Sequence, residues 1–193
     1  DGSGKTTLTR LIRAYLTLRG TSSGVFWLRG SHLAASLILR LLSLSPVFRG
    51  SCNPYYGVCV RGPLIRLWPH IEFWSLIPYL ILRSLLKIFY STLISDRGVL
   101  DFVIWVIATL RQPGFIKSLY GRFLLRIIPR EHCIYLKAPL NILIERADVP
   151  EDFLRAEYAL YEVLGPLACR CIVDTGGSVY SSLAHILRCV KPH

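Results

Sequence analysis

Asp1-Gly2-Ser3-Gly4-Lys5-Thr6-Thr7 opens the chain, and a segment with apolar residues at helical spacing follows it at once. This string matches the second half of the phosphate-binding pattern G-x-x-x-x-G-K-[ST], the P-loop. Its glycines let the backbone curl so that successive N–H groups point at phosphate oxygens, and the helix that follows adds the positive end of its dipole. The residues predicted to bind ATP are therefore Gly2, Ser3, Gly4, Lys5, Thr6 and Thr7.

Two side chains of this motif have specific chemical roles. We expect the ammonium of Lys5 to reach the β- and γ-phosphates, and the hydroxyl of Thr6 to ligate Mg²⁺. The predicted cofactors are accordingly ATP and Mg²⁺. Because the first glycine of the pattern would precede Asp1 and the chain contains no methionine, we also expect further sequence upstream.

The length and hydropathy of the chain limit its architecture. A chain of 193 residues is long enough for one α/β domain with a sizeable core, so we expect a single domain over residues 1–193. Hydrophobic residues make up 52%, so a membrane span has to be tested. A span needs about 18–20 apolar residues in a row, whereas the most apolar region, 63–94, is interrupted by Arg66, Glu72, Arg83 and Lys87. The sequence therefore predicts no transmembrane helix.

Charge and cysteine content indicate the partners and the compartment. The net charge of +11 favours a polyanionic partner, which could be nucleotide phosphates, nucleic acid or an anionic membrane. The ten tyrosines and four tryptophans could stack on bases, but core and loop positions are commoner, so no nucleic acid partner is expected. The six cysteines show no C-x-x-C spacing typical of zinc sites. With no recognisable secretory segment, this pattern predicts a cytoplasmic protein with reduced, buried thiols.

Strands alternate with helices along the whole chain. This alternation predicts a parallel sheet covered by helices on both faces. Pro69 and Pro78 are expected to break or kink the long third helix. The expected strands are 25–28, 91–95, 133–136 and 171–173; the expected helices are 8–18, 32–44, 64–90, 101–110, 115–127, 139–147, 150–164 and 178–190; and 49–62 is expected to be a loop.

Several later segments, taken in order with the opening motif, resemble the thymidylate kinase family, in which an aspartate also lies inside the P-loop. These segments are Ile94-Ser95-Asp96-Arg97, Tyr135-Leu136-Lys137-Ala138-Pro139, Ile144-Glu145-Arg146, Phe153-Leu154-Arg155-Ala156-Glu157-Tyr158 and Ile172-Val173-Asp174-Thr175. The resemblance implies an α/β P-loop NTPase fold of three layers, with a parallel five-stranded sheet whose first, central strand is missing from this chain. It implies transfer of the ATP γ-phosphoryl to the 5′-phosphate of a deoxynucleoside monophosphate such as dTMP.

The resemblance also implies roles for individual residues. Asp1 would contact the 3′-hydroxyl of the acceptor sugar, and Arg29 would serve the transferring phosphates. Arg97 would hold the acceptor phosphate, Asp96 would act near the metal or the acceptor, and Arg146 would be a lid arginine. The resulting sets are catalytic Lys5, Arg97 and Arg146; substrate-binding Asp1, Arg29, Asp96 and Arg97; and metal-binding Thr6 and Asp96.

Three departures from the family pattern leave the acceptor open. Arg29-Gly30-Ser31-His32 stands where the family has Arg-Glu-Pro-Gly, only apolar residues lie near 76–78 where the family has a base-reading arginine, and the lid at 147–152 is short and has no arginine. A deoxynucleoside kinase of the same fold is one alternative, with Glu72 or Asp96 as its base. A nucleotide-binding protein without turnover, docked at a membrane, is the other.

A basic, apolar segment in the middle of the chain bears on the membrane alternative. Its basic residues are Lys117, Arg122, Arg126 and Arg130, and its apolar residues are Phe115, Leu119, Phe123 and Ile127. The pattern is typical either of a helix at an anionic lipid surface or of a solvated helix face above a core. The expected partners are thus a nucleoside monophosphate and, less directly, a membrane surface or a second copy of the chain. Because two strands would lack their shared central neighbour, we expect the chain alone to be poorly folded.

Overall fold

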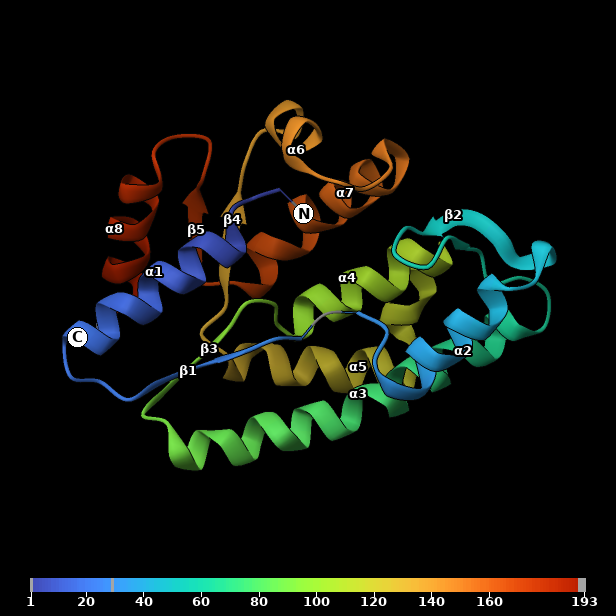
Figure 1. Cartoon of the computed structure of the whole chain (residues 1–193), viewed down its shortest axis with the longest axis horizontal. Coiled ribbons are helices and arrows are strands. Elements are labelled where there is room, and N and C mark those ends of the chain that lie inside the picture. The colour runs from blue at the N-terminus through green and yellow to red at the C-terminus, as the bar shows by residue number, and fades with distance from the viewer. Residues whose placement is uncertain (1, 29, 191–193) are drawn as a thin grey trace.

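The computed structural model describes residues 2–28 and 30–190, and within them helices alternate with short strands (Figure 1). The order is α1 (Lys5–Leu18), β1 (Ser23–Phe26), α2 (Leu33–Ser43), η1 (Pro46–Phe48), β2 (Arg49–Asn53), α3 (Leu64–Phe89), β3 (Thr92–Ser95), α4 (Val99–Leu110), η2 (Pro113–Lys117), α5 (Leu119–Ile127), η3 (Ile128–Arg130), β4 (Ile134–Lys137), α6 (Leu140–Arg146), α7 (Glu151–Ala168), β5 (Cys171–Asp174) and α8 (Val179–Val190).

Two pairs of parallel strands carry the β-structure that was expected from the sequence. β1 pairs with β3 from Ser23↔Thr92 onward, and β4 pairs with β5 from Ile134↔Cys171 onward. Both pairs are joined through helices, as parallel strands require. The chain is therefore mixed α/β with parallel strands, as predicted.

The expectation of a single sheet is not met, because the described residues form two separate two-stranded sheets. Within the described residues no strand lies between β3 and β4, so each of these strands has a ladder partner on one side only. A hydrogen-bonded ladder needs adjacent backbones about 5 Å apart. Without an intervening strand, the two pairs cannot merge into one sheet.

The centre of the larger core is α4, which lies between α7 and α5 (Figure 1). Every residue of α4 except Asp101 is buried, and a helix that is apolar all round is one that neighbours cover completely. Trp68 and Leu76 of α3 and Leu124 of α5 belong to the same cluster. A second, smaller cluster joins α1, β5 and α8 through Leu8, Val173 and Ile186.

Three expectations are corrected by the structure: a break in the third helix, a helix end at 164 and a loop throughout 49–62. α3 runs without interruption through Pro69 and Pro78, because its buried side chains hold it against the core although each proline removes a helical hydrogen bond. α7 likewise continues through Pro166 to Ala168. The expected loop at 49–62 contains the short strand β2, and Arg49 and Asn53 form bridges to Val58.

The expectation of reduced thiols was also wrong. The six cysteines form three disulfides, Cys52–Cys59, Cys133–Cys169 and Cys171–Cys189. Their Cα–Cα distances are 4.9, 4.6 and 6.2 Å, within the range that a disulfide spans. The C-x-x-C test missed these pairs because the fold brings together cysteines that are 7, 36 and 18 residues apart.

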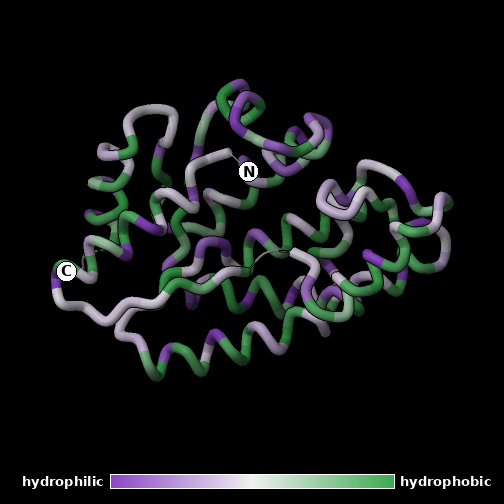
Figure 2. Tube along the Cα trace, viewed as in Figure 1, coloured by the Kyte–Doolittle hydropathy of each residue, from purple (hydrophilic) through white to green (hydrophobic). Residues whose placement is uncertain are grey.

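Apolar side chains also reach the surface, most of all along α3. None of the helices in residues 2–28 and 30–190 combines the length and the apolarity that a bilayer crossing requires. Hydrophilic and hydrophobic residues alternate along α3 (Figure 2). Its exposed apolar residues are Leu67, Trp74, Ile81, Leu82, Leu85, Ile88 and Phe89.

Candidate functional site

The loop before α1 has the backbone that the glycine motif predicts. Gly2 and Gly4 both have a φ of 78°, in the left-handed region that favours glycine. Gly4 caps α1, Lys5 is its first residue, and no side chain bonds to the cap. The first N–H groups of a helix lack intrahelical partners, and this first turn carries no acidic residue. The loop and the helix start together form a place where an anion can bind.

Thr6 and Asp96, the two predicted Mg²⁺ ligands, are in contact. Thr6 Oγ1 donates to Asp96 Oδ2 at 3.1 Å, and Thr9 Oγ1 donates to Asp96 Oδ1 at 3.5 Å. Asp96 directly follows β3, and its N–H donates to the carbonyl of Phe26 at 3.1 Å, which extends the β1–β3 ladder by one step. The ladder thus fixes the carboxylate beside the first turn of α1. A hydroxyl and a carboxylate oxygen are hard ligands of the kind that Mg²⁺ prefers, so the residues fit this ion.

Lys5 points into the same region. Its Nζ donates to Ser3 Oγ at 3.1 Å and lies 5.8 Å from the centre of the Tyr161 ring. Burial lowers the pKa of Lys5, and the positive charge of Arg97 lowers it further, while Asp101 acts in the opposite direction. Lys5 and Arg97 are therefore close enough to repel each other, and a bound polyanion would relieve that repulsion.

Arg97 lies among acidic groups. Burial by itself would lower the pKa of Arg97, but Asp101, Tyr161, Tyr55 and Glu157 outweigh it and the pKa is raised. The charge of Arg97 is consequently retained at any physiological pH. Of the predicted residues, the structure thus brings Gly2, Ser3, Gly4, Lys5, Thr6, Asp96 and Arg97 to one end of the β1–β3 pair.

Asp101 holds the position of α4 below this cluster. Its Oδ2 accepts from the Gly98 N–H at 2.8 Å, as the N3 residue of a capping box does, and its Oδ1 accepts from the Tyr161 hydroxyl at 2.5 Å. Burial and then the charge of Asp101 raise the pKa of Tyr161 well above its ordinary value. Tyr161 therefore stays protonated and donates to Asp101.

The remaining predicted site residues are placed less closely. Arg146 is the last residue of α6 and its side chain is exposed. Its backbone lies beside the loop, because a Cβ added to Gly2 would come 3.3 Å from Arg146 Cβ. The expected lid is reduced to residues 147–150 between α6 and α7. Asp1 and Arg29 lie outside the described residues. Thr7 is exposed at the first turn of α1.

Sequence reasoning missed the contribution of α7 to this cluster. Glu157 and Tyr161 both raise the pKa of Arg97. The Tyr161 ring also lies 5.8 Å from Lys5 Nζ. The spacing of four residues between Glu157 and Tyr161 places them on one face of a helix, and that was the only signal available. The sequence gives no indication that this face meets the loop before α1.

A second buried polar group centres on Glu72. Glu72 Oε1 accepts from Ser31 Oγ at 2.6 Å and from Trp68 Nε1 at 3.0 Å, and Trp105 Nε1 donates to Ser31 Oγ at 3.3 Å. Its other oxygen, Oε2, has no hydrogen-bond partner among the residues described. Burial raises the pKa of Glu72 to about 7. Next to this group, burial lowers the pKa of His32 to about 4.

One cavity lies away from those predicted site residues that the structure describes. It has a volume of about 390 Å³ and is lined by Ser51, Cys52, Ile107, Ala108, Arg111, Pro113, Asp152, Phe153, Ala156, Ala159 and Leu160. Within residues 2–28 and 30–190, none of those predicted for ATP, acceptor or metal binding lines it. The candidate site is therefore a loop and strand-end cluster and not this cavity.

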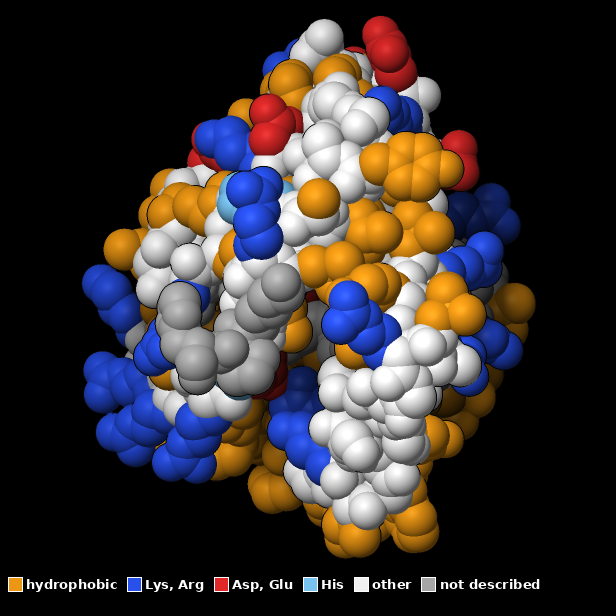
Figure 3. All heavy atoms as spheres, turned by 90° about the vertical axis from the view of Figure 1, so that its left-hand side faces the viewer, with side chains coloured by type: hydrophobic (Ala, Val, Ile, Leu, Met, Phe, Trp, Pro, Cys, Tyr) orange, Lys and Arg blue, Asp and Glu red, His pale blue; other side chains and the backbone are white. Residues whose placement is uncertain are grey.

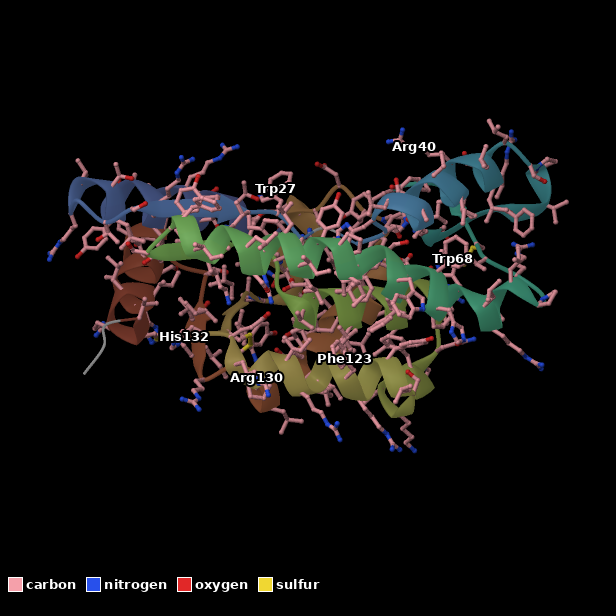
Figure 4. The ribbon with its side chains drawn as sticks, turned by 90° about the horizontal axis from the view of Figure 1, so that it is seen from below. Trp27, Arg40, Trp68, Phe123, Arg130 and His132 are labelled. Carbon is pink, nitrogen blue, oxygen red and sulfur yellow. A yellow bond between two sulfur atoms is a disulfide. The ribbon has the colours of Figure 1, made fainter. Side chains whose placement is uncertain are left out.

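The basic middle segment divides between core and surface. Phe115 is buried, whereas Leu119 and Phe123 are exposed, and Phe123 packs edge-on against Phe73 at 5.7 Å. Figure 4 labels Phe123, which belongs to α5, and Arg130, which belongs to η3. Lys and Arg also outnumber Asp and Glu on the face seen in Figure 3.

Comparison with models of known protein families gives no match, and no curated protein sequence matches the chain. The function is therefore inferred from the geometry of the site.

Proposed function

We propose that this chain binds Mg-ATP through residues 2–7 and transfers the γ-phosphoryl to a nucleoside monophosphate, as a thymidylate kinase-like enzyme. The contact between Thr6 and Asp96 carries the proposal. In P-loop NTPases a Thr or Ser of the loop and an Asp at a strand end hold Mg²⁺ together. Here the same two residue types, 90 positions apart, lie 3.1 Å from each other beside a glycine loop.

The arrangement of elements supports a P-loop NTPase fold of the kind proposed. α1 packs against β1, β3 and α8, so the helix that follows the glycine loop covers the parallel strands. The polar residues lie at the carboxyl end of β3, where ligands bind in open α/β sheets. The strands on either side of the gap, β3 and β4, would both border a further central strand in the proposed five-stranded sheet.

The two positive groups suit the reaction. Phosphoryl transfer depends mostly on positioning and on stabilising the charge of the transferring group. Lys5 would hold the phosphates of ATP, and Arg97 the phosphate of the acceptor. Mg²⁺ held by Thr6 and Asp96 would neutralise charge on the β- and γ-phosphates. Asp1, Arg29 and Arg146 complete the proposal as acceptor and lid residues, dTMP is the proposed acceptor and the cytoplasm the proposed compartment.

The test is ADP release from Mg-ATP by the chain when each nucleoside monophosphate is offered in turn. Lys5→Ala is compared with Lys87→Ala, which removes the same charge from an exposed position of α3. Turnover with one acceptor that is lost only in Lys5→Ala supports the kinase. ATP binding that depends on Lys5, without turnover for any acceptor, would instead indicate a non-catalytic nucleotide-binding protein.

Glu72 favours a second candidate, a deoxynucleoside kinase that phosphorylates a free 5′-hydroxyl. Glu72 accepts a hydrogen bond from Ser31, in the segment that follows β1, and burial raises its pKa to about 7, which suits a general base near neutral pH. Offering thymidine in place of its monophosphate distinguishes the two reactions. If thymidine is phosphorylated and Glu72→Gln abolishes that turnover, the second candidate replaces the first.

A further inference from the structure

A second cluster of chemically reactive side chains joins β5 to α8. Cys171 opens β5, and His185 and Cys189 belong to α8. One donor atom from each of the three residues lies within 4.8 Å of the other two. Two sulfurs and one imidazole nitrogen at this separation are a ligand set for a soft or borderline metal ion.

Each of the three donor residues belongs to a helix or a strand that fixes the position of its backbone. His185 and Cys189 are four residues apart in α8, so they share one face of the helix. Cys171 is held by the β4–β5 ladder, where it pairs with Ile134. α8 packs against both β5 and α1 (Figure 1). Two elements that pack directly on each other thus supply all three ligands.

Exposure allows both a reductant and a metal ion to enter. His185 and Cys189 are exposed, whereas Cys171 is buried. The described structure has Cys171 and Cys189 joined as a disulfide, and in that state neither sulfur is a thiolate that can bind a metal. Metal binding at this place therefore requires the disulfide to be opened first.

We propose that reduction of the Cys171–Cys189 disulfide converts this cluster into a Zn²⁺ site formed by Cys171, His185 and Cys189. A dithiol reductant supplies two electrons and two protons, so that the S–S bond breaks, two S–H groups form and the reductant becomes a disulfide. Zn²⁺ then binds both sulfurs as two protons leave to solvent, and the neutral imidazole of His185 adds a third bond. A water molecule fills the fourth position, as in zinc sites with three protein ligands.

The required geometry is close to that of the oxidised structure. Zn–S bonds of about 2.3 Å and Zn–N bonds of about 2.0–2.1 Å at tetrahedral angles separate the donor atoms by about 3.5–3.8 Å. The donor atoms already lie within 4.8 Å of one another, and the two cysteine Cα atoms are 6.2 Å apart. Side-chain rotation can therefore form the site without moving α8 away from β5.

The experiment titrates the full chain with Zn²⁺, once oxidised and once fully reduced under nitrogen, and measures bound metal by native mass spectrometry and by competition with a chromogenic chelator. Co²⁺ serves as the spectroscopic probe, because thiolate ligation gives a charge-transfer band. The reduced chain is expected to bind one equivalent, and the oxidised chain none. Equal binding by the two forms, or no binding by the reduced form, would overturn the proposal.

Matched variants identify the ligands. His185→Ala, at an exposed helix position, is expected to weaken Zn²⁺ binding at least as much as loss of an outer-shell partner does, about 10–100-fold. His132→Ala, also exposed and labelled in Figure 4, is the control and is expected to have no effect. His185→Cys supplies a thiolate in place of the imidazole, so it is expected to keep the Zn²⁺ binding that His185→Ala loses.

The other cysteines provide a second control, because full reduction frees them as well. The double variants Cys52→Ser/Cys59→Ser and Cys133→Ser/Cys169→Ser are expected to keep the bound equivalent, and Cys171→Ser is expected to lose it. Retention of the cobalt–thiolate band in Cys171→Ser would assign the metal to another pair and contradict the proposal.

Discussion

Thr6 and Asp96 share a hydrogen bond of 3.1 Å, and the residue-scale test of the proposed function concerns this contact. Thr6→Val keeps the shape of the side chain and removes the oxygen that would ligate Mg²⁺. We expect the gain in ATP affinity that Mg²⁺ provides to fall by about tenfold, which corresponds to about 1.4 kcal/mol. Isothermal titration with ATP, with and without Mg²⁺, measures this gain.

Thr17→Val is the matched control for this measurement. Thr17 is exposed on the same helix, and its hydroxyl donates to the carbonyl of Arg13 within that helix. The Mg²⁺ dependence of ATP binding should remain unchanged in this variant. If Thr6→Val also leaves it unchanged, Thr6 is not a metal ligand.

Glu72 gives a prediction about pH and stability. Burial raises its pKa in the folded chain to about 7 from the ordinary value of 4.5. The folded chain therefore binds the proton more tightly than the unfolded chain, so Glu72 makes the free energy of unfolding fall as pH rises from about 4.5 to about 7. Relative to Glu72→Gln, the native chain should lose about 3 kcal/mol over this window. Urea denaturation at a series of pH values measures the difference.

The comparison between variants is necessary because His32 titrates with the opposite sign. Burial lowers its pKa to about 4, so the unfolded chain holds that proton more tightly and stability from His32 rises between about pH 4 and 6.5. The His32 contribution is the same in the native chain and in Glu72→Gln, so it cancels when their free energies of unfolding are compared. Glu145→Gln, at an exposed glutamate of α6, should keep the native pH dependence. A Glu72→Gln profile parallel to the native one would show that Glu72 has an ordinary pKa.

At the scale of single elements, α3 carries a cost that can be measured. Pro78 is exposed and lies inside the helix. A proline in a helix interior costs about 3 kcal/mol, and its restriction of the unfolded chain returns up to about 1 kcal/mol. Pro78→Ala should therefore raise the free energy of unfolding by about 2 kcal/mol in urea denaturation.

Ser84→Ala, on the same helix, is the control for this substitution. Ser84 is exposed, and its hydroxyl bonds only to the carbonyl of Leu80 within the helix. We expect a gain of less than about 0.5 kcal/mol, the difference in helix propensity. A Pro78→Ala gain no larger than that of Ser84→Ala would mean that the helix already accommodates the proline without loss.

The types of the main elements could be predicted from the sequence, and some of their ends could not. Apolar periodicity and short apolar runs indicated all the longer helices and the four parallel strands. Pro78 was expected to break or kink its helix and the helix at 150–164 to end before Ala168, because the packing that offsets the cost of an internal proline is not visible in the sequence. The disulfide between Cys133 and Cys169 depends on the β4–β5 register, for which a single sequence contains no signal.

At the scale of the whole molecule, the two largest of the three hydrophobic clusters in the described part of the chain predict two unfolding steps. Trp68 and Trp105 belong to the larger cluster, and Trp27 and Trp74 adjoin its members Phe26 and Phe73. Among the described residues the smaller cluster contains no tryptophan. Tryptophan fluorescence therefore reports the larger cluster, whereas far-UV circular dichroism reports every helix. We expect the dichroism transition to begin at a lower urea concentration than the fluorescence transition.

Substitutions of two leucines test whether the two clusters unfold separately. Leu8 lies in the smaller cluster and Leu76 in the larger one, and both are buried. Each change to alanine should cost about 2–5 kcal/mol. Leu8→Ala should shift only the early dichroism phase, and Leu76→Ala should shift the fluorescence transition. Identical shifts of both probes by both variants would show one cooperative unit.

The assembly of the site was predictable only where the motif fixes the geometry. Gly2, Gly4, Lys5 and Thr6 form a local string, so their arrangement followed from the sequence. Asp96 was identified through the family resemblance of the segment 94–97, and it accepts a hydrogen bond from Thr6 at the end of the β1–β3 pair. Glu157 and Tyr161 join the cluster because α7 packs against α4, a long-range contact that no local pattern indicates.

The close approach of Gly30 to Trp105 limits which residues homologous chains can carry at these two positions. A Cβ added to Gly30 would come within 2.4 Å of the Trp105 indole, so the two positions compete for one volume. Homologous chains should therefore show coupled substitution: any residue other than glycine at position 30 is tolerated only together with a smaller side chain at position 105. This correlated pair gives a signature by which distant relatives can be recognised when overall similarity has been lost.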